Sequence, residues 1–245
     1  LSLVPISAKV RKRQNRMTIL CVIISIFLVT AIFSVADMMI RTQSDRMTGK
    51  NGSWHIELDG ISQETALKIA ERDDVVSIGA VTIFNPDGEL PYRMDGKRVV
   101  LYGIDESYLT MNSTGAAEGR FPQGMGEIML SSNAARVLQV AVGDTVTLRT
   151  PSGDWDFTVS GLGGVEESYY SGQYSLMDAY LPRTAFAALM EQNNVHNLQT
   201  SYYVQFTSAS KAAKAIPELT AQHNLPENAV SENTGVMAIA GQSDS

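Results

Sequence analysis

The chain has 245 residues, of which 19 are Lys or Arg and 26 are Asp or Glu, and it contains one cysteine, Cys21. Five of the basic residues precede residue 17, so the remainder carries 14 basic against 26 acidic residues, a balance of −12. This acidic balance argues against a nucleic-acid partner. A single cysteine excludes an internal disulfide framework, so the folded part depends on a hydrophobic core.

Residues 17–36 form an uncharged, mostly apolar run behind a basic, acid-free segment. The five basic residues of that segment are Lys9, Arg11, Lys12, Arg13 and Arg16. A helix of about 20 residues is ~30 Å long, which matches the hydrocarbon core of a bilayer. Lys and Arg next to a span favour the cytoplasmic side. We therefore predict a cytoplasmic basic segment at 1–16, a transmembrane helix at 17–39 and an extracytoplasmic domain at 40–245.

A cleaved signal peptide and a buried core helix are the alternatives for this run. Ser34-Val35-Ala36 resembles the small-residue end of a signal sequence, but the apolar run is longer than the roughly 7–15 residues of a signal h-region. A core helix would carry a polar stripe, whereas the Ser and Thr positions here are few. They are Thr18, Ser25, Thr30 and Ser34. Such small side chains bond back to the helix backbone and suit packing between membrane helices, which hints at membrane neighbours.

The first part of the exterior predicts a β-α-β unit whose elements are separated by clear turn signals. The predicted elements are a helical extension over 40–52 that ends at Asn51-Gly52, a strand over 54–58, a helix capped by Ser62, and strands over 75–84 and 98–104. In the first strand, Trp54, Ile56 and Leu58 alternate with polar residues. We therefore expect these three side chains on one side of the strand.

The centre of the chain predicts a β-rich segment, and a second strand-helix unit follows it. The predicted strands are 127–130, 145–149, 155–162, 179–181 and 202–206, and the predicted helices are capped by Ser131 or Ser132, opened by Pro182, and capped by Ser208 or Ser210. The last helix extends over 211–223, and we expect Pro217 to kink or interrupt it.

Two strand-helix units that flank a β-rich insertion predict an α+β fold. We assign an α/β subdomain to about 50–115 and 165–235, and an inserted β-rich subdomain to about 116–164. The helices of the two units are expected to cover one face of a shared sheet.

Four motifs follow one another in the central segment. They are Gly119-Arg120-Phe121, Gly126-Glu127-Ile128-Met129-Leu130-Ser131, the stretch from Leu138 to Leu148 with Gly143-Asp144 inside it, and Phe157-Thr158-Val159-Ser160-Gly161. In order and spacing, this pattern resembles the periplasmic core domain of the MacB and FtsX-like ABC-transporter permeases. The resemblance covers nearly the whole chain, and the central motifs carry it most strongly.

The resemblance implies an α/β, porter-like subdomain with a small β-rich part inserted in it. It also implies two protein partners for the permease, a separate cytoplasmic ABC ATPase and a second permease subunit in a homo- or heterodimer, together with contact to membrane lipid. The implied function couples ATP hydrolysis to motion of the exterior domain for export or extraction of a substrate. We expect the chain to be part of a longer parent with three further spans.

The alternative function is a single-pass anchored binding or sensor module, or a regulator of a cell-wall hydrolase, without transport. We predict no enzyme activity and no catalytic, cofactor or metal site. Gly96-Lys97-Arg98 lacks the upstream glycine and the hydroxyl of a phosphate-binding loop. The three histidines, at positions 55, 196 and 223, are too scattered for a local metal site.

Two further patterns resemble catalytic arrangements. Ser208 and Lys211 match the Ser-x-x-Lys nucleophile pattern, but a capping serine followed by a surface lysine gives the same letters, and the companion motifs are missing. We therefore interpret Ser208 as a helix cap. The adjacent acids Asp73-Asp74 and Glu166-Glu167 are expected to be solvated rather than acid-base pairs.

An aromatic, glycine-bearing loop follows the β-rich segment. It contains Gly164, Tyr169, Tyr170, Gly172 and Tyr174. Such a loop contacts a substrate or partner in some proteins and packs on its own sheet in others. The sequence leaves both interpretations open.

Overall fold

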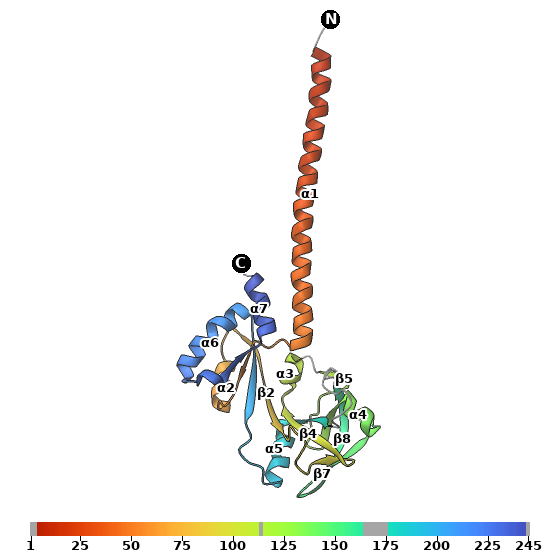
Figure 1. Cartoon of the computed structure of the whole chain (residues 1–245), viewed down its shortest axis with the longest axis vertical. Helices are drawn as coiled ribbons and strands as arrows, with labels where there is room; N and C mark the ends of the chain where they lie inside the picture. Colours follow the sequence, from red (N-terminus) through yellow and green to blue (C-terminus); the bar gives the residue numbers. More distant parts are fainter. Residues whose placement is uncertain (1–3, 113–114, 164–175, 244–245) are drawn as a thin grey trace. The chain divides into compact units, whose positions relative to one another are not determined.

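The computed structural model describes residues 4–112, 115–163 and 176–243. It divides into two compact units, Leu1–Arg46 and Met47–Ser245, which are described separately. Figure 1 shows α1 (Val4–Asn51) as one long helix. The first unit ends at Arg46, within this helix.

The apolar stretch Arg16–Ala36 of α1 is long and apolar enough to cross a membrane. Within it, the Thr30 hydroxyl donates to the Ile26 carbonyl at 2.8 Å and the Ser34 hydroxyl donates to the Thr30 carbonyl at 2.9 Å. These bonds satisfy the hydroxyls inside the helix, as predicted for small polar residues in a span. The helix ends where Asn51-Gly52 predicts, and Gly52 adopts a φ of +81°.

The second unit contains one hydrogen-bonded sheet, which has eleven strands among the described residues. The strands are β1 (Ile56–Leu58), β2 (Val75–Phe84), β3 (Arg93–Met94), β4 (Lys97–Ile104), β5 (Ala116–Gly119), β6 (Glu127–Ser131), β7 (Thr145–Thr150), β8 (Gly153–Gly163), β9 (Leu176–Pro182), β10 (Thr200–Phe206) and β11 (Val230–Glu232). The helices are α2 (Gln63–Ala70), α3 (Glu106–Met111), α4 (Ser132–Leu138), α5 (Arg183–Gln192), α6 (Ala209–His223) and α7 (Thr234–Ser243), with a 3-10 turn at Glu227–Ala229.

Six strands close a ring in the order β4, β9, β6, β8, β7 and β3, returning to β4. The β4–β9 and β6–β8 pairs are parallel, and the other four pairs are antiparallel. Alternate residues of these strands are buried together in one core, including Leu101, Leu130, Leu148 and Phe157. The ring therefore has the inside-outside alternation of a small barrel, filled by side chains.

The sheet extends away from the ring through β2, β10, β1 and β11, all in antiparallel pairs. Helices α2 and α6 cover one face of this extension, as predicted from the two strand-helix units (Figure 1). Their buried residues Ile69 and Ala212 pack in one cluster with Ile56, Leu58 and Val204. Helix α3 contacts β2, where a Cβ on Gly79 would lie 2.4 Å from the Tyr108 nitrogen.

Three serines begin helices in the way the sequence predicts. Ser62, Ser131 and Ser208 each accept a hydrogen bond from the backbone N–H three residues later, at 3.1–3.2 Å. This decides between the paired alternatives, because Ser131 rather than Ser132 caps α4 and Ser208 rather than Ser210 caps α6.

Two local predictions differ from the structure. Helix α6 runs through Pro217, so the predicted interruption is wrong, and the predicted kink stays a prediction. The carbonyl that proline leaves unbonded belongs to Ala213, which is exposed, so water can replace the lost partner. Trp54 does not join Ile56 and Leu58 under the helices but packs edge-on against Tyr203 at 4.9 Å, because the strand begins only at Ile56.

The predicted β-rich insertion at 116–164 does not form a sheet of its own. Its strands join the rest of the domain through β3–β7 and β6–β9 hydrogen bonding. The subdomain boundaries that the sequence suggests remain predictions. The strands β3, β5 and β11 and the helix α3 were not predicted, because two to six residues give no usable period, and the ten-residue helix α7 was not predicted either.

Candidate functional site

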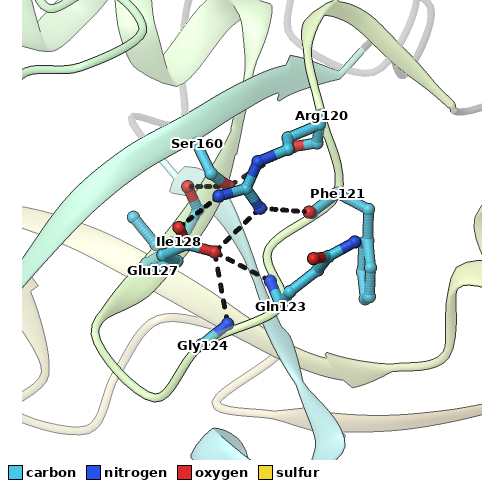
Figure 2. A network of polar contacts seen from close by, with 7 residues as sticks. All are labelled: Arg120, Phe121, Gln123, Gly124, Glu127, Ile128 and Ser160. Atoms are coloured by element: carbon cyan, nitrogen blue, oxygen red, sulfur yellow. Dashed lines mark hydrogen bonds and ion pairs between the residues drawn. The ribbon is translucent and has the colours of Figure 1, made fainter.

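The Gly-Arg and Gly-Glu motifs meet in one polar network (Figure 2). The Arg120 guanidinium donates to both carboxylate oxygens of Glu127, at 2.9 Å to Oε2 and 2.5 Å to Oε1. Arg120 Nη1, the nitrogen that donates to Oε2, also donates to the Phe121 carbonyl at 3.1 Å. A bidentate pair of this kind fixes both distance and orientation. It therefore joins the residue that follows β5 to the first residue of β6.

Glu127 also closes the loop between these strands. Its Oε2 accepts hydrogen bonds from the backbone N–H groups of Gln123 at 2.8 Å and Gly124 at 3.2 Å. The pair with Arg120, followed by the Gln123 amide, lowers the pKa of Glu127 to about 2. At neutral pH the carboxylate is fully charged and every one of these donors is satisfied.

The glycines of the motifs allow β5 and β8 to approach closely. Gly119 has a φ of +73°, and a Cβ there would lie 2.4 Å from the Ser160 carbonyl oxygen. A Cβ on Gly161 would lie 2.4 Å from the Arg120 carbonyl oxygen. The Ser160 hydroxyl lies 3.3 Å from the carbonyl oxygens of Arg120 and Ile128 (Figure 2). Only glycine fits at these two positions without displacing backbone.

The Gly143-Asp144 turn is also held by hydrogen bonds between motifs. The Gly143 amide donates to the Val159 carbonyl and the Val159 amide donates to the Asp144 carbonyl, both at 2.8 Å, and the Asp144 carboxylate accepts from the Ala141 amide at 2.8 Å. The four motifs that carry the resemblance are thus mutual supports of one backbone arrangement. Their contacts explain the spacing of the motifs and assign no chemistry to them.

The residues considered for chemistry lie apart. The Lys211 backbone amide donates to the Ser208 hydroxyl at 3.2 Å, which supports the interpretation of Ser208 as a helix cap. Asp74 is paired with Arg72 at 2.8 Å rather than with Asp73. Gly96 lies in the β3–β4 hairpin and not at a helix start.

The histidines do not come together. His55 is buried, and its Nδ1 accepts a hydrogen bond from the Phe206 amide at 3.1 Å. Burial lowers the pKa of His55 below its usual 6.5. His196 and His223 are an exposed loop residue and the last residue of α6. Across the described ranges, no group of three or more His, Cys, Asp or Glu side chains is placed to hold a metal ion.

The aromatic loop with Tyr169, Tyr170 and Tyr174 lies outside the described residues, as do Glu166 and Glu167. The two interpretations of that loop therefore remain predictions.

An acidic and aromatic group on the face opposite α2 and α6 was not singled out from the sequence. The Tyr203 hydroxyl donates to Glu57 at 2.8 Å, and the Tyr203 ring packs edge-on against Trp54 and Tyr108, with centroids 4.9 and 5.0 Å away. Burial raises the pKa of Glu57, and burial together with the Glu57 charge raises the pKa of Tyr108 to about 12. The sequence contains a signal for this group, because Glu57 lies between two core residues of its strand and must therefore face the opposite side of the sheet.

Residues 17–222 match the family model of the MacB-like periplasmic core domain. The chain belongs to this MacB-like family. The match includes the span and the whole motif network, so the resemblance carried by the Gly-Arg and Gly-Glu motifs is confirmed.

The MacB-like fold is also found among solved structures. The periplasmic region of MacB from Actinobacillus actinomycetemcomitans has a TM-score of 0.53 and 15% identity, covering 81% of this chain and 95% of that chain. The extracellular domain of YknZ, a noncanonic ABC-type transporter from Gram-positive bacteria, has a TM-score of 0.48 and 16% identity, covering 70% and 88%. The first of these likenesses confirms the mixed α/β fold. No curated protein matches the chain.

Proposed function

We propose that the chain supplies the first membrane span and the exterior domain of an ABC-transporter permease subunit. It works with a separate cytoplasmic ATPase and a second permease subunit, and it moves its exterior domain to export or extract a substrate. One observation carries the proposal. The MacB-like match begins at residue 17, the first residue of an apolar span behind five basic residues, and it continues through the domain to residue 222.

The helix that contains the span supports a mechanical role. Its helical conformation continues for 15 residues beyond Ala36, to Asn51, which is about 22 Å at 1.5 Å per residue. Helical connections act as stiffer spacers than irregular linkers do. In this proposal, the helix carries a displacement of the span outward as far as Asn51.

The domain itself catalyses no reaction in this proposal. Ser208, the one residue in a nucleophile-like pattern, is engaged as the cap of α6. ATP turnover is therefore assigned to the partner ATPase, and the exterior domain does mechanical work.

The test is co-purification of the full-length parent with its candidate ATPase, followed by measurement of ATP turnover. We expect a stable complex whose turnover exceeds that of the ATPase alone. A variant in which Gln replaces all five basic residues before the span is expected to lose orientation and assembly, because those charges hold the amino terminus inside. A parent that forms no complex and leaves ATP turnover unchanged would overturn the proposal.

The sequence that follows Ser245 in the parent distinguishes the anchored-sensor hypothesis from the permease hypothesis. Three further apolar stretches of about 20 residues each are expected for the permease. A stop codon shortly after residue 245 would favour the sensor.

A further inference from the structure

A cleft of about 700 Å³ lies within the second unit, between α5 and the neighbouring ends of β2 and β10. Its volume falls in the range of roughly 300–1,000 Å³ that is usual for ligand sites. Thr82 and Thr200 face it from the strands, with their hydroxyls 2.7 Å apart, and Gln63 faces it from the start of α2. The motif network around Arg120 contributes nothing to this cleft.

The wall formed by α5 has a clear polarity. Arg183, Phe186, Ala187, Met190 and Glu191 line the cleft. They lie at positions i, i+3, i+4, i+7 and i+8, which form one face of a helix. A cation therefore stands at the beginning of this face and an anion at its end, with apolar side chains between them. Eight residues of helix separate the two charges by about 12 Å along the axis.

The apolar middle of the cleft is well supported. Phe186 and Met190 are 5% and 3% exposed. The ring of Phe186 packs where Gly103 of β4 has no side chain, since a Cβ there would lie 2.4 Å from it. Val195 and Leu198 add apolar surface from the segment before β10. Phe186 and Met190 therefore form a fixed base beneath the cleft, and its accessible apolar side chains are Ala187, Val195 and Leu198.

Arg183 is held only loosely by the protein. Its Nη1 lies 3.9 Å from Asp105 Oδ2, and its side chain is 32% exposed. That same carboxylate oxygen already accepts a hydrogen bond from the Ala80 amide at 3.0 Å. Within the described part of the chain, the Arg183 guanidinium makes no hydrogen bond. Most of its planar fork is thus available for a carboxylate.

The net charge of the cleft argues against a simple anion. Arg183 is accompanied by Asp105 and by the exposed Glu191, so anions outnumber cations. A ligand that carries both a carboxylate and an ammonium group matches both ends of the α5 face. An extended peptide advances about 3.3 Å per residue, so three or four residues cover the 12 Å between the charges.

We propose that this cleft binds a short apolar peptide with free termini, its carboxylate on Arg183 and its ammonium group on Glu191. The apolar side chains of the peptide contact Ala187, Val195 and Leu198 above the buried Phe186 and Met190, and the threonine hydroxyls face the peptide backbone. The site does not depend on the proposed transport function, since it is built entirely from contacts within the exterior domain.

The test uses the 245-residue chain in lipid nanodiscs and trileucine with free termini, titrated by calorimetry against empty nanodiscs. We expect a Kd below about 1 mM. Arg183→Gln and Glu191→Gln should each weaken trileucine binding about tenfold, because each variant loses one charged contact. Trileucine with a C-terminal amide, or with an acetylated amino terminus, should bind the unchanged chain about tenfold more weakly for the same reason. Arg149→Gln, an exposed arginine outside the cleft, is the matched control and should bind as the unchanged chain does.

The pairing of ends is tested by combining the changes. If the peptide carboxylate meets Arg183, the amide peptide binds Arg183→Gln no more weakly than it binds the unchanged chain, because the contact is already lost. The acetylated peptide should show the same lack of further loss with Glu191→Gln. Unchanged tryptophan fluorescence and melting temperature of the variants show that the fold is retained. Absence of trileucine binding at 1 mM, equal binding of the doubly blocked peptide, or additive losses would each overturn the proposal.

Discussion

The close approach of β5 and β8 gives a sharp test of the motif network, with Gly119→Ala as the perturbation. Gly119 has a φ of +73°, and its added Cβ would lie 2.4 Å from the Ser160 oxygen and 2.9 Å from the Gly161 Cα. Both obstacles are backbone atoms, so β5 must move away from β8. That movement weakens the hydrogen bond from the Arg120 amide to Ser160, which is 2.9 Å long.

The magnitude has two parts, and a second glycine separates them. Gly96 has nearly the same φ, +72°, but a Cβ there meets no atom within 4 Å. Gly96→Ala therefore costs only the left-handed strain, about 1 kcal/mol. Gly119→Ala adds overpacking and a weakened hydrogen bond, about 2 kcal/mol more, for a total of about 3 kcal/mol. Gly126→Ala, with open space and no positive φ, should be near neutral.

The assay is thermal unfolding of the chain in detergent, followed by tryptophan fluorescence. The chain has two tryptophans, and in a Trp54→Phe background the remaining Trp155 reports from β8 itself. At roughly 2–4 °C per kcal/mol for a domain of this size, Gly96→Ala should lower Tm by about 3 °C and Gly119→Ala by about 9 °C. Equal Tm values for these two variants would refute the close-approach argument, because the strain they share would then be the whole effect.

Three further outcomes follow from buried or paired groups. Glu127→Gln should cost about 1–2 kcal/mol at pH 7, a modest value because Arg120 is half exposed. Because its folded pKa of about 2 lies below the unfolded value of about 4.3, this stabilisation is complete above roughly pH 4.5 and is lost as pH falls toward 2. The variant should therefore show a flatter acid limb in a Tm-against-pH series. Phe157→Ala, at a residue 1% exposed, should cost about 3–5 kcal/mol in urea unfolding, and a cost under 1 kcal/mol would contradict the packed ring. His55 should titrate below pH 6.5 in an NMR series, because burial lowers its pKa. The stability of the fold should decrease as pH drops from 6.5, because a protonated Nδ1 cannot accept the hydrogen bond from the Phe206 amide. A His55 titration midpoint above pH 6.5 would contradict this.

Local pattern predicted the longer elements of this domain well. The bounds of β2, Val75–Phe84, agree with the prediction, and Ser62, Ser131 and Ser208 begin their helices by the expected cap hydrogen bonds. These features depend on residues within a few positions of each other. Alternation and capping are local properties, and for that reason the sequence alone determines them.

Closure of the ring could not be predicted in the same way. It depends on β4 pairing in parallel with β9, which brings Val99 beside Met177 across 78 positions of sequence. No turn residue specifies such a pairing, because the intervening chain carries four other strands. The predicted position of Trp54 beside Ile56 and Leu58 was wrong for a related reason. Trp54 packs on Tyr203 from a distant strand, and the local alternation does not encode this contact.

The motif network was predictable from local sequence, whereas the cleft along α5 was not. The signature residues Arg120 and Glu127 contact each other within a short loop and hold it, and the adjacent Gly119 lets the same segment approach Ser160 of β8. Residues that hold backbone together identify a fold but leave its ligands unspecified. The α5 face between Arg183 and Glu191 has the opposite character, since its charges are exposed or loosely held and its apolar middle is rigid. Rigid packing beneath exposed charge suits a binding surface, so the peptide specificity proposed for this chain depends on the α5 face rather than on the motifs that define the family.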